Sequence, residues 1–400
     1  LHLSLRRQRQ MCIRDSPIAG SHVALNAAGT RVAVGDPFFD GNVWDSITQN
    51  WKFATNVGCV RVFDWNGSAW QQVGQTISGQ SVEDRTLDQG DKSGVAVKLS
   101  DSGNRVVFGT SGAAFGEVRV FDWNGASWQR VTSSAPTLGS HPANISTLTT
   151  GLQQTGIAFG ERIAINSDGS KILIGAPLAD SNGTNSGASY VFHRPGSEWQ
   201  MLGSRIIGEA ENDRHGISVS MSSDGNRFIV GAFENDGNFA SYSLDANRGS
   251  SRVYEWDGAD WTQLGNDIDG EQAFSKSGTS VAINGSRIAI GAPYNDGGAS
   301  NGGSIRVYEW DGTEWTKLGN DIDGRSSNEQ LGTFLLLGTD QVLSAAFDKT
   351  SPAWSNSAHV LKFFSLRNDI SFFSGFPTTA ICAGSTPATS VYYGSQKLWP

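Results

Sequence analysis

The stretch SVAINGSRIAIGAP at residues 280–293, followed by RVYEWDGTEW at residues 306–315, decides the fold of this chain. Bulky and small apolar residues alternate in its first half, on both sides of an Asn-Gly pair that favours a tight β-hairpin turn. A second hairpin is expected at the Asp-Gly pair in the second half. Together they predict four short antiparallel strands, at residues 280–283, 287–290 and 305–310 and from Trp315 onward. Both faces of these strands are apolar, which is typical of a sheet covered on both sides.

The same unit recurs along the chain in altered form. Its first half returns from residues 21, 95, 161, 218 and 333, and its second half from residues 60, 118, 190, 252 and 360. The period of about 60 residues fits a four-stranded propeller blade and is too long for most helical repeats. We therefore predict an all-β protein, a β-propeller of four-stranded antiparallel blades. Six repeats are visible, and they could form a closed six-bladed ring or an incomplete seven-bladed one.

The repeat also predicts the division of the chain. Residues 1–16 carry four arginines and no repeat pattern, and we expect them to be foreign to the native protein. The propeller is expected at residues 17–373, with repeats that start near residues 20, 93, 158, 216, 278 and 332. Residues 374–400 fit no strand of the repeat well and are expected to form a tail or a partial blade.

Composition limits the classes of partner. The formal net charge of −9 argues against nucleic acid, because phosphate binding needs a basic surface. The three cysteines, Cys12, Cys59 and Cys382, have no spacing that suggests a disulfide framework or a zinc site. No apolar run approaches the length of about 18 residues that a membrane helix needs, so no transmembrane segment is predicted.

The repeat resembles the FG-GAP repeat of integrin-α-type β-propellers. Phe159-Gly160 and Gly175-Ala176-Pro177 match the two motifs that give the repeat its name, and Gly291-Ala292-Pro293 matches the second. The resemblance implies a protein for adhesion or protein recognition, extracellular or at the cell surface. The calcium loop that the family has between its first two strands is shortened here to SDG, DSG or NG, so that calcium site is not expected.

Long loops are expected between the second and third strands of a blade, at residues 38–58, 178–187, 234–250 and 294–303. Binding residues tend to lie on variable loops held by a rigid scaffold. The repeated tryptophans are better explained by packing between blades, whereas aromatic residues in these loops have no such role. The predicted partner-binding residues are therefore Phe38, Phe39, Trp44, Trp51, Phe53, Tyr242 and Trp354.

Some of these loops also contain oxygen-bearing side chains that calcium could use. The weak calcium candidates are Asp180, Asn182, Asn235, Asp236, Asn295 and Asp296. The competing interpretation is that Asn and Asp are ordinary turn residues, and it is the favoured one. No other cofactor is expected.

The sequence contains no Gly-x-Ser-x-Gly, phosphate-loop or His-Glu-x-x-His motif, so no catalytic residue is assigned. The leading hypothesis is a non-enzymatic recognition or adhesion propeller that binds a protein, matrix or glycan partner through its long loops. The alternative is a lectin-like propeller that binds carbohydrate. A glycan-active hydrolase or lyase ranks third, because two loop carboxylates could meet in the folded chain.

Overall fold

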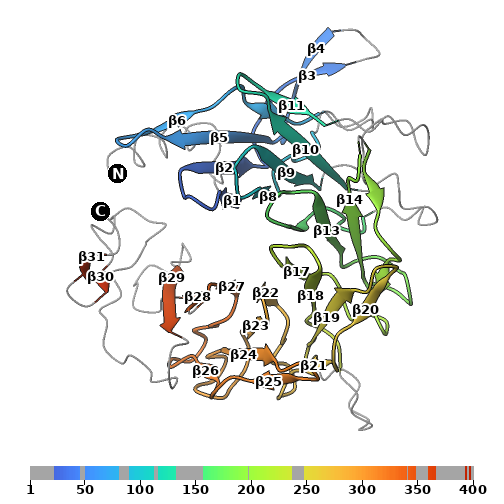
Figure 1. Ribbon diagram of the computed structural model, residues 1–400, viewed down its shortest axis with the longest axis vertical. Coiled ribbons are helices and arrows are strands. Elements are labelled where there is room, and N and C mark those ends of the chain that lie inside the picture. Colours follow the sequence, from blue (N-terminus) through green and yellow to red (C-terminus); the bar gives the residue numbers. More distant parts are fainter. Residues whose placement is uncertain are drawn as a thin grey trace. The chain divides into compact units, whose positions relative to one another are not determined.

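The computed structural model describes residues 22–45, 50–80, 90–111, 116–131, 156–196, 198–236, 247–339, 341–347, 359–365, 392–393 and 396–397. The chain divides into two compact units, Leu1–Ile207 and Gly208–Pro400. The described part of each unit is built of strands and contains no helix (Figure 1). The predicted fold class, all-β with four-stranded antiparallel propeller blades, is confirmed.

The described part of the first unit contains three sheets, each with a path of four strands, which we number as blades 1 to 3. Blade 1 is β1 (His22–Leu25), β2 (Arg31–Asp36), β5 (Cys59–Trp65) and β6 (Trp70–Gln72). Blade 2 is β8 (Ala96–Leu99), β9 (Arg105–Thr110), β10 (Glu117–Trp123) and β11 (Trp128–Arg130). Blade 3 is β12 (Arg162–Ile165), β13 (Lys171–Ala176), β14 (Ala188–His193) and β15 (Gln200–Met201).

The second unit continues the pattern with blades 4 to 6. Blade 4 is β17 (Ser218–Met221), β18 (Arg227–Ala232), β19 (Ser250–Trp256) and β20 (Trp261–Gln263). Blade 5 is β22 (Ser280–Asn284), β23 (Arg287–Ala292), β24 (Ser304–Trp310) and β25 (Trp315–Lys317), close to the four strands expected from its sequence. The described part of blade 6 has three strands, β27 (Phe334–Leu337), β28 (Gln341–Phe347) and β29 (His359–Ser365).

The outer edge of most blades carries a second short strand. After a break, the chain pairs again with the third strand of its blade, through β7 (Ile77–Ser78), β16 (Ile206–Ile207), β21 (Ile268–Asp269) and β26 (Ile322–Asp323). Two small hairpins lie outside the blades: β3 (Gly41–Asp45) with β4 (Asn50–Ala54), and β30 (Tyr392–Tyr393) with β31 (Gln396–Lys397).

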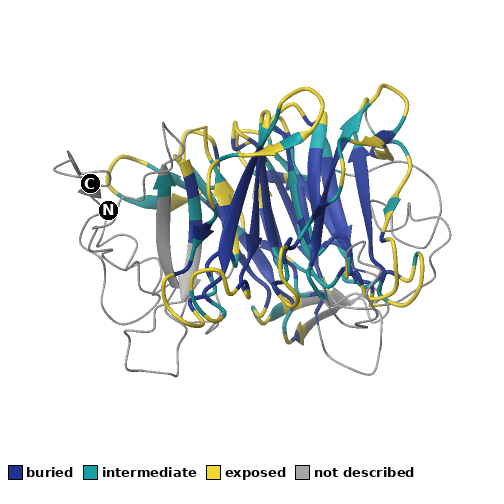
Figure 2. Ribbon diagram, turned by 90° about the horizontal axis from the view of Figure 1, so that it is seen from below, coloured by how far each residue is buried: buried dark blue, intermediate teal, exposed yellow. Residues whose placement is uncertain are grey.

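Within each unit, the hydrophobic core lies between consecutive blades. On β9, Val106 and Phe108 pack in a cluster with blade 1, whereas Val107 between them packs in a cluster with blade 3. In the second unit, Ile288 of β23 packs with blade 4 and Ala289 with blade 6. Successive side chains of a strand point to opposite faces, so blades 2 and 5 are covered on both sides, as the apolar sequence predicted. Figure 2 shows the buried residues along the strands and the exposed ones at the turns.

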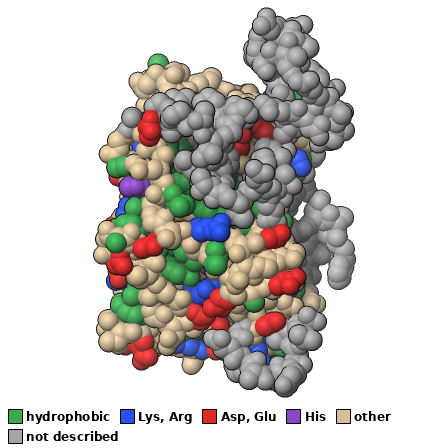
Figure 3. All heavy atoms as spheres, turned by 90° about the vertical axis from the view of Figure 1, so that its right-hand side faces the viewer, with side chains coloured by type: hydrophobic (Ala, Val, Ile, Leu, Met, Phe, Trp, Pro, Cys, Tyr) green, Lys and Arg blue, Asp and Glu red, His purple; other side chains and the backbone are tan. Residues whose placement is uncertain are grey.

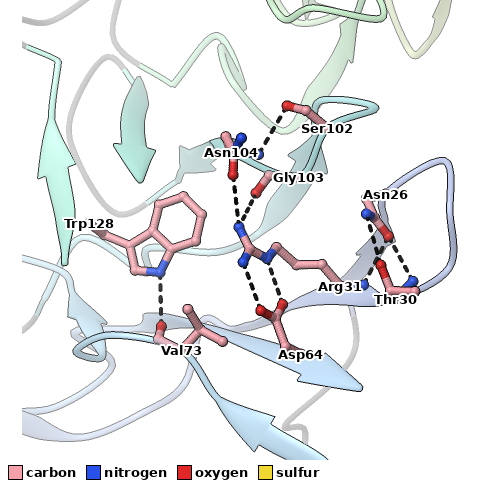
Figure 4. A network of polar contacts seen from close by, with 9 residues as sticks. All are labelled: Asn26, Thr30, Arg31, Asp64, Val73, Ser102, Gly103, Asn104 and Trp128. Carbon is pink, nitrogen blue, oxygen red and sulfur yellow. Dashed lines mark hydrogen bonds and ion pairs between the residues drawn. The ribbon is translucent and has the colours of Figure 1, made fainter. Parts of the chain in front are cut away.

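An arginine at the start of the second strand joins each of several blades to the next. Arg31 of β2 forms a two-pronged ion pair with Asp64 of β5, at 2.6 and 2.7 Å. Its remaining nitrogen donates to the carbonyl of Gly103 and to Asn104 Oδ1 in the first turn of blade 2, as Figure 4 shows. Paired guanidinium–carboxylate bonds fix both orientation and distance. The repeated Arg and Asp residues therefore hold neighbouring blades in register.

A tryptophan completes the same contact between blades. Trp128 of β11 is only 2% exposed, and its indole Nε1 donates to the carbonyl of Val73 in the broken outer strand of blade 1, at 3.0 Å. Figure 4 shows this bond beside Arg31. In the second unit, Trp315 donates in the same way to Leu264, at 2.8 Å. These two repeated tryptophans therefore have the packing role that the sequence suggested.

The two motifs that define the repeat meet at the inner edge of the blades. Gly160, from the Phe-Gly motif of blade 3, has a φ of +88°, a conformation that glycine adopts without strain. Gly109 occupies in β9 the position that the Gly-Ala-Pro glycine has in other blades. A Cβ atom on Gly109 would lie 1.8 Å from the carbonyl oxygen of Gly160. The two glycines are required because the backbones of adjacent blades touch there.

Candidate functional site

The loops between the second and third strands close on one repeated hydrogen bond, which we call the loop staple. In each staple, an Asp after the second strand accepts a hydrogen bond through Oδ1 from the backbone N–H of a later Asn. Each of these Asn residues has a positive φ, which Asn tolerates better than most residues. The four staples are Asp40–Asn56, Asp180–Asn185, Asp236–Asn247 and Asp296–Asn301, at 2.8, 2.8, 2.8 and 2.6 Å.

A backbone hydrogen bond lies beside each staple. The carbonyl of the residue before the Asp accepts from a glycine N–H two residues after the Asn, for example Phe39 from Gly58 at 2.9 Å and Ala179 from Gly187 at 2.8 Å. The stapled residues are 5 apart in blades 3 and 5, but 11 apart in blade 4 and 16 apart in blade 1. The base of the loop is therefore the same whatever the length of chain above it.

The loop of blade 1 is the longest of the four and contains an extra hairpin above its staple. Strands β3 and β4 pair in antiparallel register, with Trp44 opposite Trp51 and Asn42 opposite Phe53. Figure 1 shows the hairpin extending away from the sheet of blade 1. Phe53 is 60% exposed and Phe38, at the start of the loop, is 38% exposed. A hairpin that projects from the blade and exposes Phe53 is the strongest candidate for a contact surface.

The structure places the predicted partner-binding residues unequally. Phe38, Phe39 and Phe53 share the loop of blade 1, where Phe39 is half-buried with the Arg61 guanidinium 5.0 Å above its ring. Trp44 and Trp51 lie in the same loop by their backbones, but their side chains are outside the described part of the structure, as are Tyr242 and Trp354 altogether. One loop thus unites five of the seven predicted residues.

The calcium candidates hold the loops together in the structure. Asp180, Asp236 and Asp296 each use one carboxylate oxygen in a loop staple. The buried Asn235 donates to Glu209 Oε2 at 3.2 Å, and the buried Asn295 accepts from the N–H of Gly297 at 2.7 Å. The backbone N–H of Asn182 donates to Ser186 Oγ at 2.8 Å.

These bonds favour the interpretation of the six residues as turn residues. Within the described residues, no three His, Cys, Asp or Glu side chains are grouped so that they could hold a metal ion. Calcium binding by these loops stays a prediction.

Buried arginines on the third strand of a blade anchor the linker that leads into the first strand of the same blade. Arg119 of β10 forms a buried ion pair with Asp91, and burial raises the pKa of Asp91 although the arginine opposes this. In blade 4, a guanidinium nitrogen of Arg252 lies 3.3 Å from Nδ1 of the fully buried His215. Burial and the nearby Arg252 hold the pKa of His215 well below its usual value. Both groups fix a linker in place.

One linker carries exposed groups that the repeat pattern of the sequence does not indicate. In the linker at residues 270–278, Phe274 is 57% exposed with a φ of +61°. Lys276 lies over the rings of Phe233 and Tyr294, at 5.0 and 5.5 Å. Alignment of the linkers with one another would have revealed Phe274, because Asn212 and Asn328 occupy the same position in the linkers before and after it.

Comparison with known proteins supports the presence of the repeat in one part of the chain. Residues 146–192 match the family model for the FG-GAP repeat, which includes both named motifs of blade 3 and confirms the resemblance found in the sequence. A search of curated proteins finds no match. Among the described residues, no helix is long and apolar enough to span a membrane.

Proposed function

We propose that the chain is a non-enzymatic recognition module that acts outside the cell or at its surface. It binds a protein or matrix partner through the loop at residues 38–58. The FG-GAP repeat supports this class of function, because such repeats are typical of extracellular propellers used in recognition. No catalytic motif competes with it in the sequence.

The observation that carries the proposal is the hairpin β3–β4 above the staple of Asp40 and Asn56. The staple shows that blade 1 could close its loop with a few residues, as blades 3 and 5 do. The longer loop instead presents Phe53 and Phe38 to solvent. Exposed aromatic side chains on a rigid support supply much of the binding energy at protein interfaces. Closure of the loop does not require the hairpin, which supports contact with a partner as its role.

A loop exchange tests the proposal. Residues 41–55 are replaced by Gly-Gly-Ala-Ser, which is the sequence of residues 297–300 between the stapled Asp296 and Asn301. Binding is measured on surfaces coated with purified matrix proteins, such as collagen, fibronectin and laminin. We expect the exchange to abolish binding and to leave the melting temperature unchanged, because the staple is kept.

Point variants separate the aromatic side chains from the loop as a whole. The pair Phe38→Ser and Phe53→Ser should weaken binding by at least tenfold, whereas Gln71→Ser on the exposed surface of β6 should not. Binding that survives the loop exchange would refute the assignment of the site. If the native chain binds none of the coated proteins, the proposed class of partner is refuted for those proteins.

Carbohydrate is the second candidate ligand, since Trp44 and Trp51 are paired in the register of the hairpin and sugars stack on aromatic rings. A glycan array probed with the native and loop-exchanged chains distinguishes the two. A saccharide signal that the loop exchange removes would replace the protein partner with a lectin function.

A further inference from the structure

Three linkers of the second unit have the same length and the same backbone. They span residues 208–216, 270–278 and 324–332, and they lead into β17, β22 and β27. The fifth and seventh residues of each linker have a left-handed backbone conformation. In the three linkers in turn, these residues are Asn212 and Arg214 (φ 66° and 55°), Phe274 and Lys276 (61° and 51°), and Asn328 and Gln330 (56° and 52°).

The middle linker departs from the other two at its fifth residue. Asn212 and Asn328 are suited to this conformation, because the short side chain of Asn tolerates a positive φ. Phe274 is a bulky residue for which that φ is strained, and its ring is 57% exposed, so burial does not compensate the strain. Strained residues that the fold does not require are often kept for a function.

The seventh residue of the same linker is a lysine held between two aromatic rings. The ammonium of Lys276 lies 5.0 Å from the ring centre of Phe233 and 5.5 Å from that of Tyr294, which is itself 37% exposed. Among the described residues, no carboxylate forms an ion pair with Lys276, whereas the equivalent Arg214 pairs with Glu234 at 2.5 Å. The rings restrict the lysine side chain and leave its charge available to an anion.

We propose that Phe274 and Lys276 form a second contact surface, separate from the loop of blade 1, for an acidic and apolar segment of a protein partner. Phe274 contacts an apolar side chain of that segment. Lys276 pairs with a carboxylate next to it, and the rings of Phe233 and Tyr294 hold the lysine in position. The proposal accounts for both departures of this linker from its neighbours.

Charge favours a peptide over a polyanion as the ligand. The chain has a net charge of −9, and acidic side chains are spread between neutral and basic ones on the face that Figure 3 shows. A sulfated or phosphorylated polymer is repelled by such a chain at long range, and it needs several cations to bind. A single available lysine beside an exposed phenylalanine matches one carboxylate beside one apolar side chain.

The first test needs no partner. Phe274→Asn gives the middle linker the residue of its two neighbours, and we expect the melting temperature to rise by about 2–4 °C because the backbone strain is relieved. The reverse change at the equivalent position, Asn328→Phe, should lower the melting temperature. A Phe274→Asn variant that is no more stable than the native chain would contradict the strain on which the proposal depends.

The second test measures binding by fluorescence anisotropy. The probe is a labelled peptide with one Glu beside one Leu in an otherwise neutral, polar sequence, and its control has Gln in place of Glu. The native chain should bind the Glu peptide at least fivefold more tightly than the Gln peptide. Lys276→Gln, which is the residue of the last linker, should remove that preference. Phe274→Asn should weaken binding of both peptides.

Two further measurements complete the test. The loop-exchanged chain should bind the Glu peptide as the native chain does, so the failure of either binding site can be seen independently of the other. Loss of peptide binding in that variant would show that the two surfaces are not separate and would overturn the proposal. Binding of a heparin-derived oligosaccharide that depends on Lys276, without binding of the Glu peptide, would also overturn it.

Discussion

The contacts between blades are repeated along the chain, whereas the loops between the second and third strands differ in length from blade to blade. Between blades, the same bonds recur, as in those that Arg31 donates to the carbonyl of Gly103 and Arg105 to the carbonyl of Gly169. In the loops, only the staple recurs, and the chain between its two residues varies from a short turn to a hairpin. The contacts between blades therefore stabilise the fold, whereas the loops can vary and acquire a function.

Removing a tryptophan between blades should have the largest effect on stability. Trp128→Ala deletes a buried indole and its hydrogen bond to Val73, so we expect a loss of about 3–5 kcal/mol in the free energy of unfolding, measured by urea titration. Trp70→Ala, at the equivalent but half-buried position of blade 1, should lose less. Equal losses would mean that the contact of Trp128 with the preceding blade does not contribute to the free energy of unfolding.

A methyl group at the glycine contact should be nearly as harmful. Gly109→Ala places a Cβ atom against the carbonyl of Gly160, and the backbones of blades 2 and 3 must then separate. We expect a loss of about 1–3 kcal/mol, or failure to fold, as for other overpacked sites. Gly125→Ala is not a suitable control because Gly125 has a φ of +97°, but Gly196→Ala is, since no atom lies near its Cβ position. A stable Gly109→Ala variant would show that the blades can move apart without loss.

Acid should weaken the linker of blade 4 by an intermediate amount. The pKa of the buried His215 is depressed, so the unfolded chain takes up a proton near pH 6.5 before the folded chain does. Stability from this group is therefore present above pH 6.5 and is lost as the pH falls toward the lowered pKa. His215→Ser, which copies Ser93 and Ser277 in other linkers, should reduce the fall in melting temperature between pH 7.5 and pH 5. An unchanged fall would exclude His215 as its cause.

Loss of a staple should have the smallest effect of the four. Asp180→Ala and Asp40→Ala each remove the hydrogen bond of a staple to a backbone N–H at an exposed loop base, which is worth about 0.5–1.5 kcal/mol. Similar losses at the two sites, in urea titrations, would show that the staple acts independently of loop length. A much larger loss for Asp40→Ala would show that the hairpin of blade 1 also stabilises the blade.

The blades could be predicted from the sequence because their evidence is local. Asn-Gly and Asp-Gly pairs specify hairpins, and alternation of apolar residues specifies strands covered on both faces. The position of Phe38, Phe39 and Phe53 in one loop followed from their spacing. The staples could not be predicted, because Asp40 and Asn56 are separated by a hairpin and each looks like an ordinary turn residue. The position of Lys276 over the rings of Phe233 and Tyr294 could not be predicted either, because the two rings come from different blades.

The sequence by itself determined the repeat, the strands within each blade and the loop that could hold a binding site, since each depends on residues close together in the chain. Only the tertiary structure decided what the repeated residues do. Arg31, Trp128 and Gly109 act on a neighbouring blade, and the loop aspartates close loops, because their partners are distant in sequence. Backbone conformation likewise decided that Phe274 is unusual, since a positive φ at an exposed phenylalanine is visible only in the folded chain.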